Sequence, residues 1–485
     1  MSVDHPFKTV VLSLVLLGLM LLAIAGLDYL LRADTFPVRN VSFEGEFKHV
    51  NQRQLAEAVT DRASGNFFAL DLSAVQRAAE AVPWVHRAMV RRRWPDGLHI
   101  QFTEQQLAIK DSVGKLCAQF DGKYWLKKDK EGGFPEDFYR AMADAGWLGI
   151  AMPEEYGGAG LGIAEAAIMM QTVAESGAAL QGASAIHLNV FGPNPIVVFG
   201  TDEQKRRILP DIIAGKVKGC FAVTEPDAGL NTTALETKAE RDGNGYIVHG
   251  KKTFTTTASV ADKMLLIART TPKDKCKRAT DGLSLFYTDF DRSKIEVTEI
   301  EKMGRKAIDT NQVFIDGLKV PLEDRIGEEG KGFHYLLHGL NPERILIAAE
   351  AIGIGKCALA KATQYAKERI VFGRPIGKNQ AIQHPLAESW MQLEAANLLA
   401  FKAAWLYDNG HECGAEANSA KYLGARWAYE ACERAILTHG GYGYAKEFHV
   451  ERFLREVMIA RIAPVSEQLI LCYVAERVLG LPKSY

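Results

Sequence analysis

Hydrophobic periodicity changes twice along the larger part of the chain, and this constrains the fold more than any other feature. In residues 103–217 apolar side chains recur at helical spacing, as at Ile109 and Val113. Residues 218–326 are rich in Thr, Val, Ile and Gly and alternate as strands do, and helical spacing returns from residue 328. The sequence therefore predicts a helical domain, a β domain and a second helical domain.

The first of these domains is predicted to begin with almost no linker before it. Thr103 and Gln106 fit the Ser/Thr-x-x-Glu/Gln capping box, in which each residue satisfies the other's free backbone N–H. We therefore expect a helix to start at Thr103, directly after a strand.

The N-terminal residues contain an uncharged run, Thr9–Leu27, that is long enough to cross a hydrocarbon layer about 30 Å thick. One membrane helix is the prediction. A cleaved signal peptide is the alternative, because Ala23-Ile24-Ala25 has the small-x-small form of a cleavage site. Basic residues lie on both sides of the run, so their count leaves its orientation open.

Residues 36–102 describe a small α+β unit. A strand-like stretch around Val41 is followed by two helical patterns, the second capped by Asp71. Two alternating segments then flank the turn Pro95-Asp96-Gly97, which predicts a hairpin. The expected order is strand, helix, helix, strand, strand.

That order behind one apolar helix, with the phrases FPVRNVSFEGEFKHV, GNFFALDL and VPWVHRAMVRRRWPDGLHI, resembles the POTRA domain of the bacterial division protein FtsQ. The resemblance covers residues 1–105 and implies an uncleaved anchor in the inner membrane, a docking module without catalysis, and division proteins as partners. Arg91, Arg92 and Arg93 are candidates to touch a partner or lipid headgroups; solvent-facing strand positions explain them as well.

Composition excludes several other classes. Lys and Arg number 58 against 59 Asp and Glu, so no net basic field is available to hold nucleic acid. Seven cysteines without a C-x-x-C pair favour reduced, buried thiols in a cytosolic setting. We expect no metal, because the histidines lack ligand spacing at His384, His411, His439 and His449.

Four phrases in the larger part are candidates to hold a planar, phosphorylated ligand. FAVTEPDAGLNTTA offers small residues and the Thr224 hydroxyl, and GKKTFTTTAS is a strand carrying hydroxyls. In KERIVFGRPIGKNQAIQH, Arg369 can grip a phosphate, and the paired glycines of THGGYGYAKEFHVERFLRE let the backbone approach a diphosphate. Each of these four phrases can also be explained by structure alone. In the same order, the explanations are a turn, the ordinary β propensity of Thr, a helix end with a Gly stop, and a connection between two helices.

With MPEEYGGAG, GTDEQKRRILP and KMGRKAIDTNQVFIDGLKVP, the order and spacing of these phrases resemble the acyl-CoA dehydrogenase family over residues 103–485. The resemblance implies an α-helical domain, a middle β barrel, a C-terminal four-helix bundle, and FAD reached by a neighbouring subunit. The expected segments of the whole chain are an anchor, a POTRA-like domain and three dehydrogenase domains, at residues 1–35, 36–103, 104–217, 218–327 and 328–485.

Residue roles follow from the same resemblance. It assigns one group to the flavin and the acyl thioester: Phe221, Val223, Thr224, Gly229, Leu230, Phe254 and Thr256. It assigns a second group to the FAD of an adjacent subunit: Arg369, Phe372, Gln380, Gly440 and Gly441. The chain departs from the usual family pattern at Leu230-Asn231, Phe254 and Leu437, which weakens individual ligands more than the family resemblance.

The expected reaction needs a carboxylate that removes the proton α to the thioester while a hydride leaves the β carbon. Pro464 stands where most of the family carries the catalytic Glu, and Glu467 falls on the following helix. A minority of the family, similar to isovaleryl-CoA and long-chain enzymes, carries the base on an earlier helix, which GLNPERILIAAEAIG resembles. Glu343 is the candidate base, and Arg344 is expected to steady the acyl-CoA end.

A structural reading of Glu343 competes with this one. Asn341-Pro342-Glu343 also suits a helix start, with a cap, a first-turn proline and an acid that complements the helix dipole.

The function expected is thus FAD-dependent oxidation of an acyl-CoA to the trans-2-enoyl-CoA in fatty acid metabolism. Electrons would pass to an electron-transferring flavoprotein, and the enzyme would form a homodimer or homotetramer. The alternative is a membrane-anchored, FtsQ-like division scaffold, or an artificial fusion, with an inactive dehydrogenase module. It rests on a conflict: an anchor at residues 9–27 exports the remainder of the chain, whereas FAD, CoA and reduced thiols place the enzyme in the cytoplasm.

Overall fold

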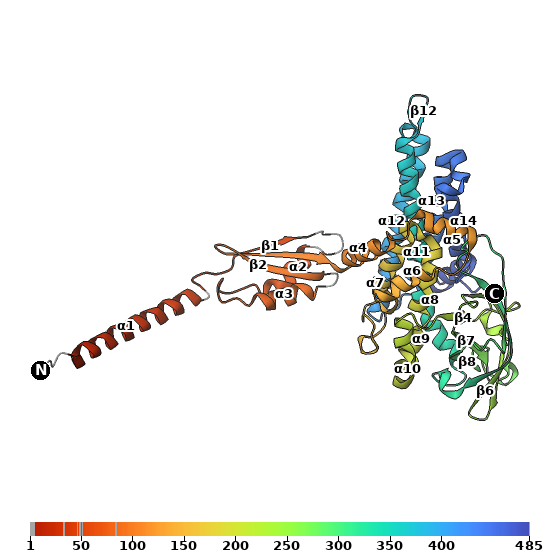
Figure 1. Cartoon of the computed structure of the whole chain (residues 1–485), viewed down its shortest axis with the longest axis horizontal. Helices are drawn as coiled ribbons and strands as arrows, with labels where there is room; N and C mark the ends of the chain where they lie inside the picture. Colours follow the sequence, from red (N-terminus) through yellow and green to blue (C-terminus); the bar gives the residue numbers. More distant parts are fainter. Residues whose placement is uncertain are drawn as a thin grey trace. The chain divides into compact units, whose positions relative to one another are not determined.

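The computed structural model describes residues 5–32, 34–45, 47, 50, 52–82 and 85–484, without the side chains of residues 5–9, 23, 31, 86 and 103–106. The chain divides into two compact units, residues 1–111 and 112–485 (Figure 1). Each unit has its own core, so each is described by itself.

The first unit is an apolar helix followed by a three-stranded sheet with two helices. Its elements are α1 (His5–Leu31), β1 (Asn40–Glu44), α2 (Gln52–Thr60), α3 (Leu72–Glu80), β2 (Val85–Arg93) and β3 (Gly97–Glu104). The sheet order is β1-β3-β2, with β1 parallel and β2 antiparallel to β3. Leu55, Val75 and Ile100 meet in its core, and Asp71 accepts the backbone N–H groups of Ser73 and Ala74. The predicted element order and the α3 cap are confirmed.

The expected junction without a linker, a helix that starts almost inside the last strand, is confirmed. Thr103 pairs with Arg87 and lies in β3, which runs to Glu104, and helix α4 (Gln105–Cys117) begins only after it. A capping residue has an extended backbone, so the pairing of Thr103 across the sheet is compatible with its predicted place before the helix. The hydrogen bonds expected of the box lie outside the described side chains.

The second unit begins with a helical domain that has a mostly apolar interior. It comprises the last residues of α4, which crosses the boundary between the units, together with α5 (Gly122–Glu131), α6 (Glu136–Asp144), α7 (Ile163–Val173), α8 (Ala179–Phe191), α9 (Asn194–Phe199) and α10 (Asp202–Ile213). Helices α7 and α8 are rich in small and aliphatic residues and are buried over nearly their whole length, so their polar side chains, such as Gln181 and His187, lie inside the fold.

A β domain follows. Its strands are β4 (Gly219–Ala222), β5 (Lys238–Asp242), β6 (Gly245–Thr256), β7 (Lys263–Arg269), β8 (Leu283–Asp289), β9 (Ile295–Glu299), β10 (Thr310–Pro321) and β11 (Arg325–Ile326). The order is β11-β8-β7-β5-β6-β10-β9, with β4 paired to β7. Residues of β4, β5, β6, β7, β8 and β10 share one core, so the sheet curves around it as the predicted barrel requires.

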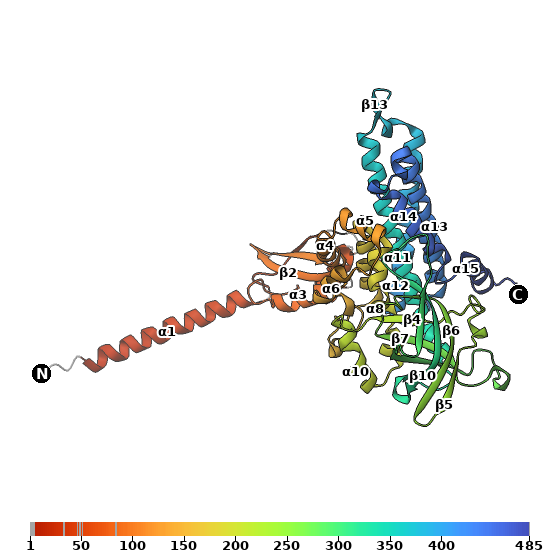
Figure 2. The same cartoon turned by 45° about the vertical axis from the view of Figure 1, so that its right-hand side comes forward.

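The C-terminal domain is a bundle of long helices. It contains α11 (Gly332–Glu368), α12 (Gln380–Asp408), α13 (Gly414–His439), α14 (Val450–Ile462) and α15 (Glu467–Tyr473), with the hairpin β12 (Ile370–Val371) and β13 (Arg374–Pro375) between α11 and α12. A Cβ at Gly355 would lie 3.0 Å from the Ala428 backbone, so α11 and α13 pack closely through small residues. Figures 1 and 2 both show the hairpin at one end of the bundle and the β domain at the other.

Candidate active site

One group of predicted ligand residues lies where β4 ends. Phe221 is in β4, and Val223 and Thr224 follow it into a loop. That loop is held by a buried ion pair between Lys252 Nζ and Glu225 Oε1 (2.8 Å), and Lys252 also donates to the Val223 carbonyl (3.1 Å). Thr224 remains partly exposed, and Gly229 and Leu230 at the far side of the loop are exposed. The loop is therefore a rigid, open edge beside the barrel.

Phe254 and Thr256 lie near the end of β6, next to an irregularity in the sheet. The pairing of β10 with β6 shifts between Asn311 and Val313, and Phe254 takes a positive φ of 55°. This backbone conformation is strained for a large side chain, which here is exposed instead of buried. The irregular pairing and the positive φ thus coincide with an exposed aromatic ring at the end of β6.

The second group lies at the hairpin end of the bundle. Phe372 (φ 50°) and Gly373 (φ 75°) form the hairpin turn, and Phe372 is 100% exposed. Arg369, Gly440 and Gly441 line one open cavity of about 690 Å³. A Cβ at either glycine would meet nothing within 4 Å, so the backbone there is open to a ligand.

Gln380 opens helix α12 beside this hairpin and is exposed. The alternative interpretation of KERIVFGRPIGKNQAIQH as a plain helix end with a Gly stop is thus incomplete, because the hairpin β12–β13 follows the end of α11. Within one chain, the hairpin-end group and the barrel-side group lie at opposite ends of the bundle (Figure 1).

Glu343 lies inside α11, and the helix-start reading of Asn341-Pro342-Glu343 is wrong. The helix begins at Gly332, so Pro342 is an interior residue and Glu343 is far from the helix end. Glu343 keeps some solvent-exposed surface as a residue, whereas its Oε2 atom is buried and has no hydrogen-bond partner among the described residues. Burial raises the pKa of the Glu343 carboxyl to about 7, although the charges of His187 and Arg344 partly offset this rise.

Glu343 shares a helix face with a residue that approaches the barrel side. Gly339 precedes it by one helical turn, and positions i and i+4 lie on the same face. Gly339 and Leu340 lie beside Phe221 and Leu265 around a narrow apolar gap that has no room for a water molecule. The structure thus brings the α11 segment that carries Glu343 close to the β4 end of the first ligand group.

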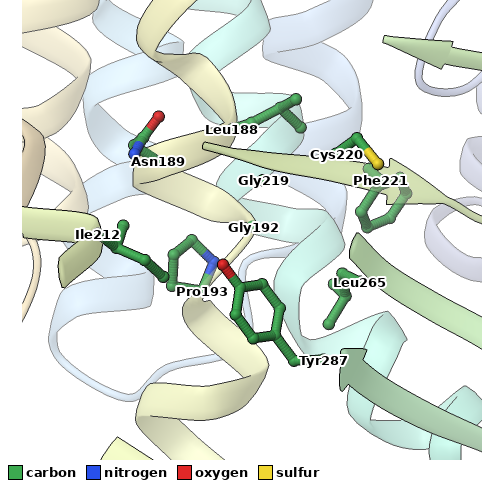
Figure 3. A pocket seen from close by; sticks show the side chains of 10 residues that line it. All are labelled: Leu188, Asn189, Gly192, Pro193, Ile212, Gly219, Cys220, Phe221, Leu265 and Tyr287. Atoms are coloured by element: carbon green, nitrogen blue, oxygen red, sulfur yellow. The ribbon is translucent and has the colours of Figure 1, made fainter. Parts of the chain in front are cut away.

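The adjoining cavity is small and apolar. It has a volume of about 20 Å³, room for roughly one water molecule, and lies between α8 and the sheet beside Phe221. Figure 3 shows the Tyr287 ring, with its hydroxyl near Pro193, on the same side as Leu265. The Tyr287 oxygen has no hydrogen-bond partner within the described part of the chain.

A buried imidazole–carboxylate pair lies next to Glu343. His187 Nδ1 of α8 and Glu350 Oε1 of α11 are 2.5 Å apart, and Glu350 is fully buried. Burial alone would lower the pKa of His187, but the charge and hydrogen bond of Glu350 outweigh it and raise that pKa. Glu350 follows Glu343 by two helical turns, so both carboxyls are on the α11 face that meets His187.

Two further cations lie near Glu343. Arg344 Nη1 donates to Asn341 Oδ1 (3.0 Å). Lys421 Nζ donates to the Val465 carbonyl (2.6 Å), and burial lowers the pKa of Lys421 to about 8. Lys421 thus holds the loop after Pro464, where the usual family base would be. Glu467 is bound by Arg461 at 2.7 Å, which lowers its pKa.

Sequence reasoning missed His187, Glu350 and Lys421. A signal was present for Glu350, because an acid inside the apolar stretch LIAAEAIG needs a buried partner. Its partner is 163 residues away in the sequence, which no local pattern reveals.

Two stretches of the described residues are long and apolar enough to cross a membrane, Val10–Leu30 and Val450–Val478. The first is exposed along nearly all its length, whereas the second contains buried bundle residues such as Phe453 and Val457. The first is the candidate membrane span.

Comparison with known families assigns both units. Residues 36–105 match the FtsQ-type POTRA domain. Residues 103–216, 220–318 and 330–479 match the N-terminal, middle and C-terminal domains of acyl-CoA dehydrogenase. Acyl-CoA dehydrogenase FadE12 of Mycobacterium tuberculosis is 37% identical over 389 residues, which is 79% of this chain and 98% of FadE12.

Two further proteins are similar at comparable length. The caffeyl-CoA reductase–Etf complex subunit CarC of Acetobacterium woodii is 35% identical over 377 residues, 76% of this chain and 96% of CarC. The structure of butyryl-CoA dehydrogenase from Megasphaera elsdenii superposes with a TM-score of 0.72 at 30% identity, covering 76% of this chain and 98% of that one.

The open glycine backbone, the Arg369 cavity and the exposed β6 bulge fit the planar, diphosphate-bearing cofactor of that family. The chain therefore belongs to the acyl-CoA dehydrogenase family, as an FAD-dependent enzyme acting on acyl-CoA that also carries an FtsQ-type POTRA domain.

Proposed function

We propose that the enzyme oxidises an acyl-CoA to the trans-2-enoyl-CoA with Glu343 as the base. The carboxylate takes the proton from the carbon α to the thioester, and FAD, when bound, accepts the hydride from the β carbon. The proposal is supported by the buried, unpartnered Oε2 of Glu343, on the α11 face whose Gly339 lies beside Phe221. A pKa of about 7 leaves this carboxyl both ionised enough and basic enough to take a proton at neutral pH.

The other predicted ligands divide into two roles. Phe221, Val223, Thr224, Gly229, Leu230, Phe254 and Thr256 would line the flavin and thioester beside the barrel. Arg369, Phe372, Gln380, Gly440 and Gly441 would hold the FAD of a second copy, because they lie at the opposite end of the bundle from the first group.

Arg344 is proposed to steady the acyl-CoA. Its Nε has no hydrogen-bond partner among the residues described, so one donor remains for a ligand. An electron-transferring flavoprotein is the proposed acceptor, since the similar CarC is a subunit of a reductase–Etf complex.

The test compares two single substitutions in the purified full-length chain. Glu343→Gln should keep the yellow flavin spectrum and lose its bleaching by acyl-CoA, by at least about a thousandfold in rate. The matched control, Glu467→Gln, removes the carboxylate nearest to Pro464 and should bleach within about threefold of the unaltered enzyme. Bleaching retained in Glu343→Gln and lost in Glu467→Gln would reverse the assignment.

A second candidate function rests on the POTRA match and the candidate membrane span: an FtsQ-like scaffold whose dehydrogenase module is inactive. Protease access to the C-terminal unit and flavin content, measured in one membrane preparation, separate the two. A flavin-loaded unit on the cytoplasmic side supports the enzyme; a flavin-free unit on the outer side supports the scaffold.

A further inference from the structure

Four aromatic rings gather at one end of the three-stranded sheet. Phe36, Phe67, Phe68 and Trp94 contact one another with ring centroids 5.2–6.2 Å apart. Phe67 is buried, but Trp94 is 66% and Phe68 is 47% exposed. Aromatic clusters usually bury their outer rings. The exposed rings of Trp94 and Phe68 are therefore available to contact a membrane or another protein.

This aromatic cluster lies at the end of the sheet where the chain arrives from α1. Strand β1 starts at Asn40 opposite Gly97, the first residue of β3, and β2 ends at Arg93 opposite the same glycine. The turn that contains Trp94 therefore lies beside the chain segment that comes after the apolar helix. The backbone N–H of Arg39 donates to the Asp96 carbonyl at 2.8 Å, which fixes this proximity.

A buried amide ties the cluster directly to the end of α1. Asn66 Nδ2 donates to the carbonyls of Leu30 and Arg32, both at 2.7 Å. Asn66 Oδ1 accepts from the backbone N–H of Phe68 (2.8 Å) and of Ala69 (3.2 Å). One side chain thus joins the last carbonyls of the apolar helix to the loop that carries Phe67 and Phe68.

Arg92 holds the same loop from the strand side. Its guanidinium donates to the carbonyls of Phe67 (2.6 Å), Phe68 (3.2 Å) and Leu70 (2.8 Å). The exposed rings are therefore held at a fixed position relative to the end of the helix, because side chains of the folded domain bind both.

We infer that this aromatic cluster lies in the lipid headgroup layer of the membrane that α1 enters, with Trp94 and Phe68 in contact with lipid. Val10–Leu30 is apolar and exposed, and its C-terminal end is the point to which Asn66 attaches the cluster. Trp is enriched at this depth of a bilayer because its ring is apolar and its N–H is polar.

The charges at this end of the sheet suit the same layer. Exposed arginines lie on both sides of the cluster, at Arg32, Arg39, Arg91 and Arg93, together with the acids Asp28, Asp34 and Asp96. Arg32 is paired with Asp28 at 2.8 Å and Arg91 donates to Met89 Sδ at 2.9 Å, which leaves Arg39 and Arg93 for lipid phosphates.

Quenching by brominated lipid tests the inference in the full-length chain. In vesicles whose lipids carry bromine on the first acyl carbons, Trp fluorescence should be quenched, and Trp94→Phe should remove at least half of that quenching. The matched control is Trp147→Phe, because Trp147 is partly exposed in the other unit, outside α12, and its replacement should leave the quenching unchanged.

A rescue variant keeps the test decisive. Adding Phe68→Trp to Trp94→Phe should restore the quenching, since the two rings are 6.1 Å apart. Unchanged quenching in Trp94→Phe, in chains that resist alkaline extraction and so have α1 inserted, would overturn the inference and favour a protein partner for the rings. Chains washed off by alkali would overturn it as well, because the cluster would then face water.

Discussion

At the scale of single residues, the raised pKa of Glu343 should make the wild-type protein less stable as pH rises. A carboxyl whose pKa is about 7 in the fold, against 4.5 unfolded, binds more protons when folded, so its stabilising contribution is lost between these values. Glu343→Gln should therefore raise the Tm at pH 8 more than at pH 5, measured by thermal unfolding. Glu467→Gln should lower the Tm by similar amounts at pH 5 and pH 8, because Arg461 lowers the Glu467 pKa below 4.5 and this carboxylate loses its stabilising contribution only at more acidic pH. An equal change in Tm at pH 5 and pH 8 for Glu343→Gln would contradict the buried environment assigned to Glu343.

His187 gives a second residue-scale prediction. The groups facing Glu343 are His187 from α8, Arg344 and Glu350 from α11, and Lys421 from α13. Removing the imidazole in His187→Gln takes away a charge that lowers the Glu343 pKa, so that pKa should rise. A rise of one in pKa cuts the ionised fraction at pH 7 about fivefold. The pH profile of flavin reduction should move to alkaline pH, and adding Glu350→Gln should move it partly back; a loss of rate equal at all pH values would indicate a structural role alone.

The residue assignments show where sequence reasoning ends. The family resemblance points to Glu343 as the proposed base, because Pro464 stands at the usual position of the base and Glu343 at the alternative one. The His187–Glu350 pair cannot be selected from sequence, because it depends on how α8 packs on α11. Similarly, Phe254 was chosen for its motif position, while its positive φ arises from a bulge that only strand pairing with β10 produces.

At the scale of elements, a side chain from one helix caps another. Asp408, the last residue of α12, accepts the backbone N–H groups of Ile163 (2.8 Å) and Ala164 (2.9 Å) at the start of α7. Asp408→Ala leaves these donors unsatisfied and should lower the free energy of unfolding of the second unit by about 1–3 kcal/mol. Denaturant unfolding measures this. The matched control, Asp71→Ala, removes the α3 cap and should destabilise the POTRA unit instead; equal effects of both on one transition would contradict two independent cores.

The order of helices and strands could be predicted because the spacing of apolar residues follows burial. Most helices and strands here bury either one face or all of their surface over long stretches. The boundary that failed depends on tertiary contacts. Pro342 is tolerated inside α11 although local rules place it at a helix start. This error comes from applying a cap pattern where neighbouring elements decide the backbone conformation.

At the scale of the whole molecule, the proposed FAD ligands imply a second copy of the chain. The two proposed groups lie at opposite ends of the bundle in one chain, so we propose that one cofactor touches both when a second copy supplies the hairpin end. The exposed surface of α12 supports this, because large apolar residues there face solvent: Trp390, Met391, Leu398 and Trp405. A surface of this kind is typical of an interface between subunits.

Substitution on α12 tests that association and its link to the cofactor together. A charge buried without a partner is costly, so Leu398→Glu should shift the mass in light scattering from an oligomer toward the monomer. The flavin-to-protein ratio should fall in parallel, because the hairpin-end ligands leave with the second copy. Phe314→Glu is the matched control: Phe314 is 44% exposed on β10, away from α12, and its change should alter neither mass nor flavin content. A monomer that retains its full flavin would mean that one chain binds FAD by itself, and the role proposed for Arg369, Gly440 and Gly441 would be lost.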